Sequence, residues 1–294
     1  MTEYVGSKID IVRKSNGIED INFTQAILVQ KLADKYLTEG GRSPKTPAVY
    51  GQVLVRGYGS GTVEDKEVTV YRLGTATCMY MMQWSRPDIY NGTRGCARHM
   101  SAPMIVHLKA LQKLMKYIVA TNNRGIVLST NTVWNGSKEF ELTIHGRSES
   151  DYAGNTDDRR SVSGGRVFLN GSPVTFRSAT QKSMTLLVTA AAGAYGVMVA
   201  QDMLYVYRLL QSIILKVKLG MILETNNRGA VDLANNWSVG GRTRHVDVKN
   251  HFLRELKDEG LMVIMHVSGD DNNADIFTKN TTAAIFEKHI PNFV

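Results

Sequence analysis

The chain has 294 residues, of which 43% are apolar, so it is long enough to bury one large core or two ordinary ones. Its 35 basic residues outnumber its 27 acidic ones, which gives a net charge of +8 spread along the whole sequence. This excess favours a polyanionic partner such as nucleic acid, although proteins that bind none also carry such an excess. The only two cysteines, Cys78 and Cys96, sit in apolar or small-residue settings and imply neither a disulfide framework nor a cysteine-based zinc site.

Residues 1–15 lack the apolar segment that a signal peptide needs, so we expect an intracellular protein, cytoplasmic or nuclear. Residues 183–201 carry no charge and approach the length of a membrane span. Because this run contains two Gly, two Thr and one Ser, it is only weakly apolar. We therefore interpret it as a buried helix and expect no contact with a membrane.

The N-terminal part of the chain is predicted to be mostly helical, after a short strand pair at residues 3–10. Two segments rich in Gly, Pro and charge predict loops at residues 40–51 and 57–67. Apolar residues at helical spacing predict helices at residues 23–36, 71–84 and 104–119, and one more that begins near Asp88 after the helix-breaking Arg86-Pro87.

The helix expected at residues 104–119 is amphipathic, with Lys109, Lys113 and Lys116 on its polar face. A row of lysines fits an ordinary solvated face, which is the commoner case. Contact with nucleic acid is the alternative.

After residue 125 the pattern changes to alternating segments separated by turns, which predicts a mixed α/β domain. The predicted strands are residues 140–145, 166–170, 174–177, 221–225 and 261–267. The predicted helices are residues 186–215, 229–236, 247–259 and one after Asp271.

Several segments resemble the copia-type branch of retrotransposon polyproteins. Residues 148–178 are similar to the first hairpin block of the family's ribonuclease H domain, and residues 226–236 to its Asp-Asn-x-x-Ala block. Residues 242–255 and ADIFTK at 274–279 are similar to its closing blocks. The resemblance implies a ribonuclease H-like domain over residues 138–294, with a five-stranded mixed sheet, flanking helices and three antiparallel neighbouring strands.

The resemblance continues upstream, where residues 3–10, 71–90 and 107–117 are similar to the end of the family's reverse transcriptase. Residues 1–130 are therefore interpreted as a remnant of its thumb or connection region. The sequence Tyr-x-Asp-Asp of the polymerase active site occurs nowhere in the chain, so we expect no DNA synthesis.

Ribonuclease H cleavage uses two divalent metals held by clustered carboxylates. The resemblance places four such carboxylates at positions where this sequence has Glu149, Ala192, Asn226 and Asp275. Asp275 is retained, whereas Glu149 replaces an Asp and its extra methylene moves the oxygens by about 1 Å, a displacement that can cost about a hundredfold in rate. Ala192 and Asn226 lack the charge altogether. Asp151, on the same strand face as Glu149, is interpreted as structural.

The resemblance therefore implies a pseudoenzyme with a vacant cleft and little or no ribonuclease activity. If any metal binds, Glu149 and Asp275 are the expected ligands and Mg²⁺ or Mn²⁺ the expected cofactor. His245, Asp247 and His251 are a weaker metal candidate, because a zinc site needs a further ligand.

Three functions stay open. The first is binding of an RNA–DNA hybrid or an RNA duplex by basic residues. The same residues fit an ordinary charged surface equally well. These candidate residues are Arg159, Arg160, Lys182, Arg242, Arg244 and Lys249. The second is a structural subunit of a larger protein or ribonucleoprotein assembly. The third is a residual metal-dependent ribonuclease H.

Overall fold

The computed structural model describes residues 3–4, 6–15, 17–36, 43–56, 61–129, 136–137, 139–151, 160–181, 188–235 and 244–294, with the backbone alone for 188–194, 233, 244–250 and 292. The elements in chain order are β1 (Glu3–Tyr4), β2 (Ser7–Arg13), β3 (Glu19–Thr24), α1 (Ala26–Tyr36), α2 (Asp65–Trp84), η1 (Pro87–Ile89), α3 (Tyr90–Ala97), α4 (Ile105–Ala120), β4 (Ile126–Ser129), β5 (Glu141–Leu142), β6 (Ile144–Asp151), β7 (Val162–Leu169), β8 (Ser172–Thr180), α5 (Val188–Ser212), β9 (Lys216–Val217), β10 (Met221–Thr225), α6 (Arg228–Asn235), α7 (Arg244–Asp258), β11 (Met262–His266), η2 (Gly269–Asp271), η3 (Asn273–Phe277), α8 (Ala283–His289) and η4 (Ile290–Asn292).

The N-terminal part combines helices α1–α4 with a four-stranded antiparallel sheet in the order β1-β2-β3-β4. The predicted strand pair near the N-terminus is confirmed by β1 and β2. The prediction of helix from Phe23 was wrong at its start, because Phe23 pairs with Ile9 and Ile126 in β3 and the helix begins at Ala26. Strand β4 was not predicted.

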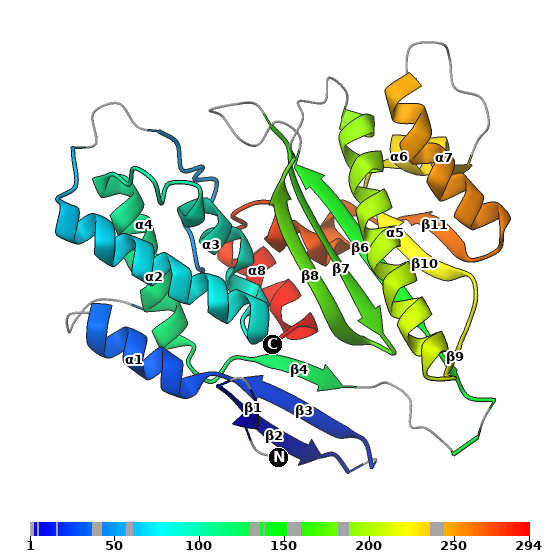
Figure 1. The fold of residues 1–294 in the computed structure, drawn as a ribbon, viewed down its shortest axis with the longest axis horizontal. Coiled ribbons are helices and arrows are strands. Elements are labelled where there is room, and N and C mark those ends of the chain that lie inside the picture. Colours follow the sequence, from blue (N-terminus) through cyan, green and yellow to red (C-terminus); the bar gives the residue numbers. More distant parts are fainter. Residues whose placement is uncertain are drawn as a thin grey trace.

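The second sheet has five strands in the order β11-β10-β6-β7-β8 (Figure 1). Strands β6, β7 and β8 are antiparallel neighbours, while β10 runs parallel to both β6 and β11. This arrangement confirms the predicted ribonuclease H-like sheet. The β7–β8 hairpin turns at Asn170 and Gly171, whose φ angles of 48° and 85° suit a tight Asn-Gly turn.

Two glycines in β7 let other elements approach both faces of this sheet. A Cβ atom on Gly165 would lie 2.4 Å from Val199 of α5. A Cβ atom on Gly164 would lie 2.7 Å from Phe277 and 3.0 Å from the carbonyl oxygen of Ala274, both in η3. Helix α5 and η3 therefore pack on opposite faces of the strand because β7 has no side chains at these two positions.

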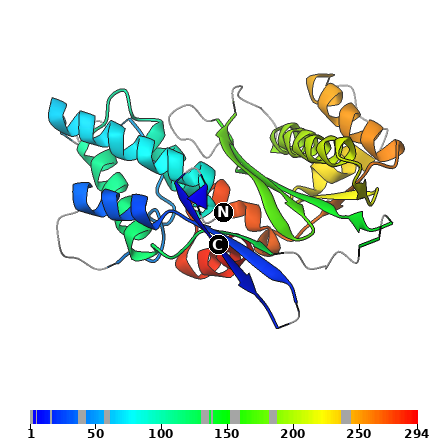
Figure 2. The same cartoon turned by 60° about the horizontal axis from the view of Figure 1, so that its bottom comes forward.

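The C-terminal segment joins the core of the N-terminal helices. One hydrophobic cluster contains Leu114 and Ile118 of α4 together with Phe277, Phe286 and Phe293. Figures 1 and 2 show α8 lying between the helical part of the chain and the five-stranded sheet. The boundary expected between residues 130 and 138 stays a prediction, since residues 130–135 and 138 lie outside the described ones.

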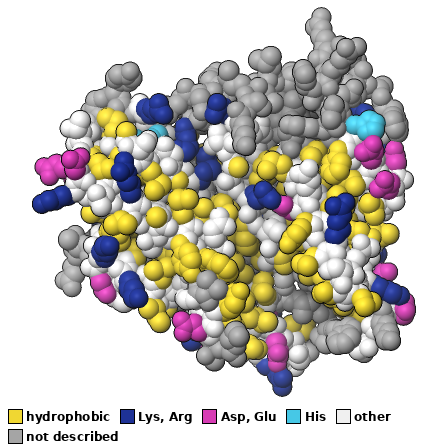
Figure 3. All heavy atoms as spheres, viewed as in Figure 1, with side chains coloured by type: hydrophobic (Ala, Val, Ile, Leu, Met, Phe, Trp, Pro, Cys, Tyr) yellow, Lys and Arg dark blue, Asp and Glu magenta, His cyan; other side chains and the backbone are white. Residues whose placement is uncertain are grey.

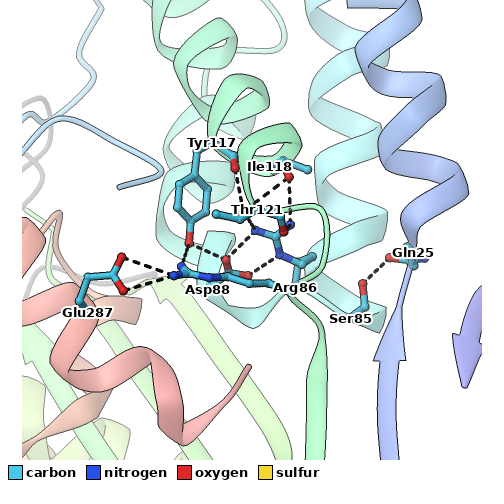
Figure 4. A network of polar contacts seen from close by, with 9 residues as sticks. Gln25, Ser85, Arg86, Asp88, Tyr117, Ile118, Thr121 and Glu287 are labelled. Atoms are coloured by element: carbon cyan, nitrogen blue, oxygen red, sulfur yellow. Dashed lines mark hydrogen bonds and ion pairs between the residues drawn. The ribbon is translucent and has the colours of Figure 1, made fainter. Parts of the chain in front are cut away.

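A buried polar network links the α2–α3 junction to α4 and α8 (Figure 4). Arg86 donates to both oxygens of Asp88, at 2.8 and 2.7 Å, and both side chains are almost fully buried. Tyr117 donates to Asp88 Oδ2 at 2.8 Å, and Arg124 links Tyr117 to Glu287. Arg86, which with Pro87 was predicted to break the helix, thus supplies a buried cation at this junction.

The uncharged run is largely the N-terminal half of α5, and residues 183–187 of it lie outside the described ones. Tyr195, Val199 and Met203 pack into a hydrophobic core with the strands of the five-stranded sheet. In the described part of the chain, no helix has both the length and the apolar character that crossing a bilayer requires.

Candidate functional site

Glu149 lies near the end of β6, the central strand of the sheet, and is only 5% exposed. Strand β10 runs beside β6 with Thr225 paired to Ser148, so Asn226 comes next to Glu149. The side chain of Asn226 hydrogen bonds the Glu149 carboxyl. The parallel register thus brings together two of the four positions that the resemblance identified.

Asp275 lies in η3, a 3₁₀ helix that precedes α8, and not in the last α-helix itself. Asn272 fixes this segment to β6, because its Nδ2 donates to Ser148 O at 3.0 Å and to Glu149 Oε2 at 3.2 Å. Its Oδ1 accepts from the backbone of Ala274 and caps η3. One fully buried amide therefore sets the position of Asp275 relative to Glu149.

Lys279 supplies a positive charge inside this group of acids. Its Nζ lies 2.9 Å from Asp275 Oδ2 and 3.9 Å from Glu149 Oε1. Asp275 and Lys279 are four residues apart, although the chain between them leaves the 3₁₀ helix at Thr278. The two acids therefore share a cation that belongs to the chain itself.

The electrostatics follow from burial. Desolvation, with the charge of Asp275 second, raises the pKa of Glu149 to about 7, against the lowering effect of Lys279. Desolvation likewise raises the pKa of Asp275 and of Asp151, and Lys279 opposes both shifts. Loss of hydration is the largest effect on Lys279 too, but its acidic neighbours outweigh it and raise the pKa of the ammonium group. Near neutral pH, the site holds less negative charge than its three acids suggest.

These residues do not fit a two-metal site. Two divalent cations carry four positive charges, whereas Asn226 is neutral and Lys279 already neutralises one carboxylate. Among the described side chains, no group of three His, Cys, Asp or Glu residues is arranged to hold a metal ion. Ala192 lies in the first part of α5, in the backbone-only segment, and alanine has no ligand atom in any orientation.

The structure tests the predicted nucleic-acid residues only in part. Arg160 is exposed just before β7. Arg244 and Lys249 lie in α7, where the backbone alone is described. Three others, Arg159, Lys182 and Arg242, lie outside the described residues. In the lysine row of α4, Lys109 is exposed, while Lys113 and Lys116 are half-buried.

Sequence reasoning missed the two residues that organise the site, Asn272 and Lys279. A signal existed for each. Asn272 stands two residues before Ala274, the spacing of an amide that caps the start of a helical turn. Lys279 follows Asp275 at the i, i+4 spacing of a local ion pair. The weaker candidate His251 pairs with Glu255 at 3.1 Å, as an ordinary surface contact along α7.

Comparisons with known proteins show what the chain is similar to in sequence. No protein-family model matches the chain. It is 28% identical over 219 residues, 74% of its length, to the retrovirus-related Pol polyprotein from transposon RE1 of Arabidopsis thaliana. It is 25% identical over 267 residues, 90% of its length, to that from transposon TNT 1-94 of Nicotiana tabacum.

The aligned regions make up only 14% and 19% of those two polyproteins. Among solved structures, a ribonuclease H1 isolated from compost aligns with 50% of this chain and 96% of its own, at 15% identity and a TM-score of 0.37. The chain is homologous to the retrovirus-related Pol polyproteins of copia-type transposons, and its five-stranded mixed sheet has a ribonuclease H-like fold.

Proposed function

We propose that this chain binds an RNA–DNA hybrid or an RNA duplex without cleaving it. The observation that carries the proposal is the ammonium group of Lys279, 2.9 Å from Asp275, in a site where Asn226 stands at a carboxylate position. Cleavage of the RNA strand needs concentrated negative charge to hold its metals. Duplex binding needs only the fold and a basic surface.

Charge supports the binding half of the proposal. The chain has a net charge of +8, and each neutralised phosphate releases a counterion and strengthens binding at low salt. Arg160 is exposed two residues before β7, the strand that pairs with the one carrying Glu149. The duplex would therefore lie across the end of β6, where the acids converge.

The experiment is to incubate the purified chain with a labelled RNA–DNA hybrid, with and without Mg²⁺ and Mn²⁺, beside its Asp275→Asn variant. We expect binding that weakens steeply with salt and no metal-dependent cleavage. Cleavage that disappears in the variant would mean that the chain is a residual ribonuclease H that uses Glu149 and Asp275. Absence of both binding and cleavage would contradict the proposal.

A second candidate function is a structural subunit of a larger assembly, and a surface feature favours it. Hydrophobic side chains gather over the face that carries α2 and α5 (Figure 3). The exposed hydrophobic side chains of these two helices include Leu73, Tyr80 and Trp84 of α2 and Tyr205 and Leu209 of α5, all between 39% and 67% exposed. A groove of about 730 Å³, lined by both helices, lies on this side of the molecule. Exposed apolar surface of this kind often marks a protein interface.

This alternative predicts one partner that co-purifies stably and little affinity for free duplex. Changing Tyr205 and Leu209 to Ser should release that partner while the far-ultraviolet circular dichroism spectrum stays the same. The matched control is Arg208→Ser, on the same helix but not among these apolar residues. Retention of the partner by the double variant would exclude this face as the interface.

A further inference from the structure

A second cavity, of about 290 Å³, opens beside the acidic site. Its walls come from the loop at residues 47–54, from α3 and α4, and from the ends of β6 and η3. The two regions share Asp151 and Lys279, which line this cavity and also act on Glu149. Whatever occupies the cavity therefore lies next to the ribonuclease H-like site.

Cations outnumber acids among the charged side chains that line this cavity. Arg94 and Arg98 of the α3 region, Lys113 of α4 and Lys279 all contribute, against one carboxylate, that of Asp151. The last of these cations is already paired with Asp275. Arg94 and Lys113 add positive charge to the cavity, and a concave, partly dehydrated surface focuses its potential.

Arg94 has a buried donor that meets no acceptor among the described residues. Its Nη1 and Nη2 atoms donate to the neutral groups Thr180 Oγ1 at 3.2 Å and Asn91 Oδ1 at 2.7 Å. Its Nε is buried and meets no acceptor in the described part of the chain. Desolvation and the nearby charge of Arg98 lower the pKa of Arg94 to about 10. The carboxylate of Asp151 opposes this shift, but the described hydrogen-bond acceptors of this largely buried guanidinium are neutral. A buried cation bonded in this way is stabilised by an anion supplied from outside.

The wall opposite α3 is held in place by a defined set of hydrogen bonds. Gly51 N donates to Asn280 O at 3.1 Å, and Asn280 Nδ2 donates to Gln52 O at 2.7 Å. Asn280 Oδ1 in turn accepts from Asn91 of α3 at 2.8 Å. Figure 1 shows this loop running beside α3 toward the C-terminal helices. These contacts preorganise the cavity, and through Asn91 they also connect to Arg94.

We infer that this cavity binds a phosphate group, and that the phosphate is one of the backbone phosphates of a bound nucleic-acid strand. A phosphate supplies negative charge and acceptor oxygens to the cationic donors Arg94 and Lys113. The planar guanidinium of arginine suits the geometry of a phosphate. The inference rests on the proposed function for the source of the phosphate. It adds that residues before the ribonuclease H-like sheet, in α3 and α4, hold the strand as it passes the acidic site.

The test measures the affinity for a fluorescein-labelled RNA–DNA hybrid as a function of salt, for the full chain and its variants. Lys113→Gln should weaken binding about five- to tenfold at 0.1 M salt and reduce the salt slope by about 1. Arg94→Gln should do the same, and because Arg94 also bonds Asn91 and Thr180, the simpler change at Lys113 keeps the test independent of folding. Lys109→Gln, which removes the same charge from an exposed site on the same helix, should bind like the unaltered chain.

Inorganic phosphate is the second probe, because it needs no duplex. It should raise the Tm of the unaltered chain and of Lys109→Gln, but not that of Lys113→Gln. If no hybrid binds and this pattern still holds, the proposed function fails while the cavity remains a site for free phosphate. If the hybrid binds but all three variants keep the original affinity and salt slope, the phosphate site is overturned and the proposed function stands. Absence of hybrid binding and of any phosphate effect would overturn both.

Discussion

The Nζ atom of Lys279 lies 2.9 Å from Asp275 Oδ2 and 3.9 Å from Glu149 Oε1, so one ammonium group serves both buried carboxyls. In a two-metal nuclease, divalent cations fill this electrostatic role. The ammonium group of Lys279 partly neutralises the carboxyls without a metal ion from solution. It also repels an incoming divalent cation and so makes metal binding less favourable. The positive charge therefore links the substitutions at the site to the absence of cleavage that we propose.

Replacing Lys279 by Gln should make the site responsive to metal. The change leaves Glu149 and Asp275 without their cation, and we expect it to lower the free energy of unfolding by about 1–3 kcal/mol. Mn²⁺ should then restore part of the loss in the variant and have little effect on the unaltered chain. Thermal denaturation with and without MnCl₂ measures both effects. Lys288→Gln, which breaks an exposed pair with Asp271, is the control; an equal response to Mn²⁺ in all three proteins would refute the prediction.

Glu149 should make stability depend on pH. Its pKa is about 7 in the folded chain, against the ordinary value of 4.5, because it is buried beside Asp275 and Asp151 and only partly compensated by Lys279. Between about pH 4.5 and 7 the folded chain holds this proton while the unfolded chain has lost it. Stability from this group is therefore present at low pH and is lost as the pH rises through 7.

Glu149→Gln removes this dependence, so the variant should be more stable than the unaltered chain at pH 8, by roughly 1–3 kcal/mol, and similar to it at pH 4.5. Thermal denaturation at the two pH values gives the difference. Glu259→Gln, at an exposed carboxylate after α7, should show no such change. A Glu149→Gln variant that gains nothing at pH 8 would mean that the buried carboxyl is not destabilised by its charge.

Much of the five-stranded sheet could be predicted because its signals are local. The strand at residues 221–225 lies where the apolar pattern placed it, and the Asn170-Gly171 turn marks the β7–β8 hairpin. Resemblance placed Glu149, Asn226 and Asp275 at corresponding catalytic positions, and the structure brings these three together. Helix α5 was expected to be buried because an uncharged helix needs a core on most sides.

What the sequence did not reveal depends on contacts between distant segments. Strand β4 pairs Ile126 with Phe23, about one hundred residues earlier, and a four-residue strand has no periodicity long enough to predict it. The cavity beside the acidic site likewise depends on distant segments. Lys113 and Lys279 both line it because the C-terminal segment packs against α3 and α4. Lysine spacing along α4 indicated a charged face but not which lysine would line a cavity.

Asp88 should be essential for stability, whatever the chain binds. Asp88→Asn removes the charge that both Arg86 nitrogens contact and leaves an almost fully buried guanidinium uncompensated (Figure 4). We expect a loss of about 3–5 kcal/mol in urea denaturation. Glu287→Gln, at the exposed end of the same network, should cost at most about 1 kcal/mol. Similar losses of unfolding free energy for the two variants would mean that burial of the Arg86–Asp88 pair does not increase its contribution to stability.

Gly164→Ala should disturb the acidic site, because Gly164 pairs with Glu149 across β6 and β7 and faces η3 on the same side of the sheet. The added methyl group would lie 2.7 Å from Phe277 Cβ and 2.8 Å from Thr278 Cγ2, so η3 must shift away from the sheet. Overpacking of this kind typically costs about 1–3 kcal/mol. Because η3 carries Asp275 and precedes Lys279, the shift should also separate these residues from Glu149 and lower the pKa of Glu149. Nuclear magnetic resonance titration of the Glu149 carboxyl would measure the pKa, and urea denaturation the stability. Gly269→Ala, where nothing lies within 4 Å of the added atom, should change neither; an unchanged pKa in Gly164→Ala would show that the contact of η3 with β7 does not set the geometry of the site.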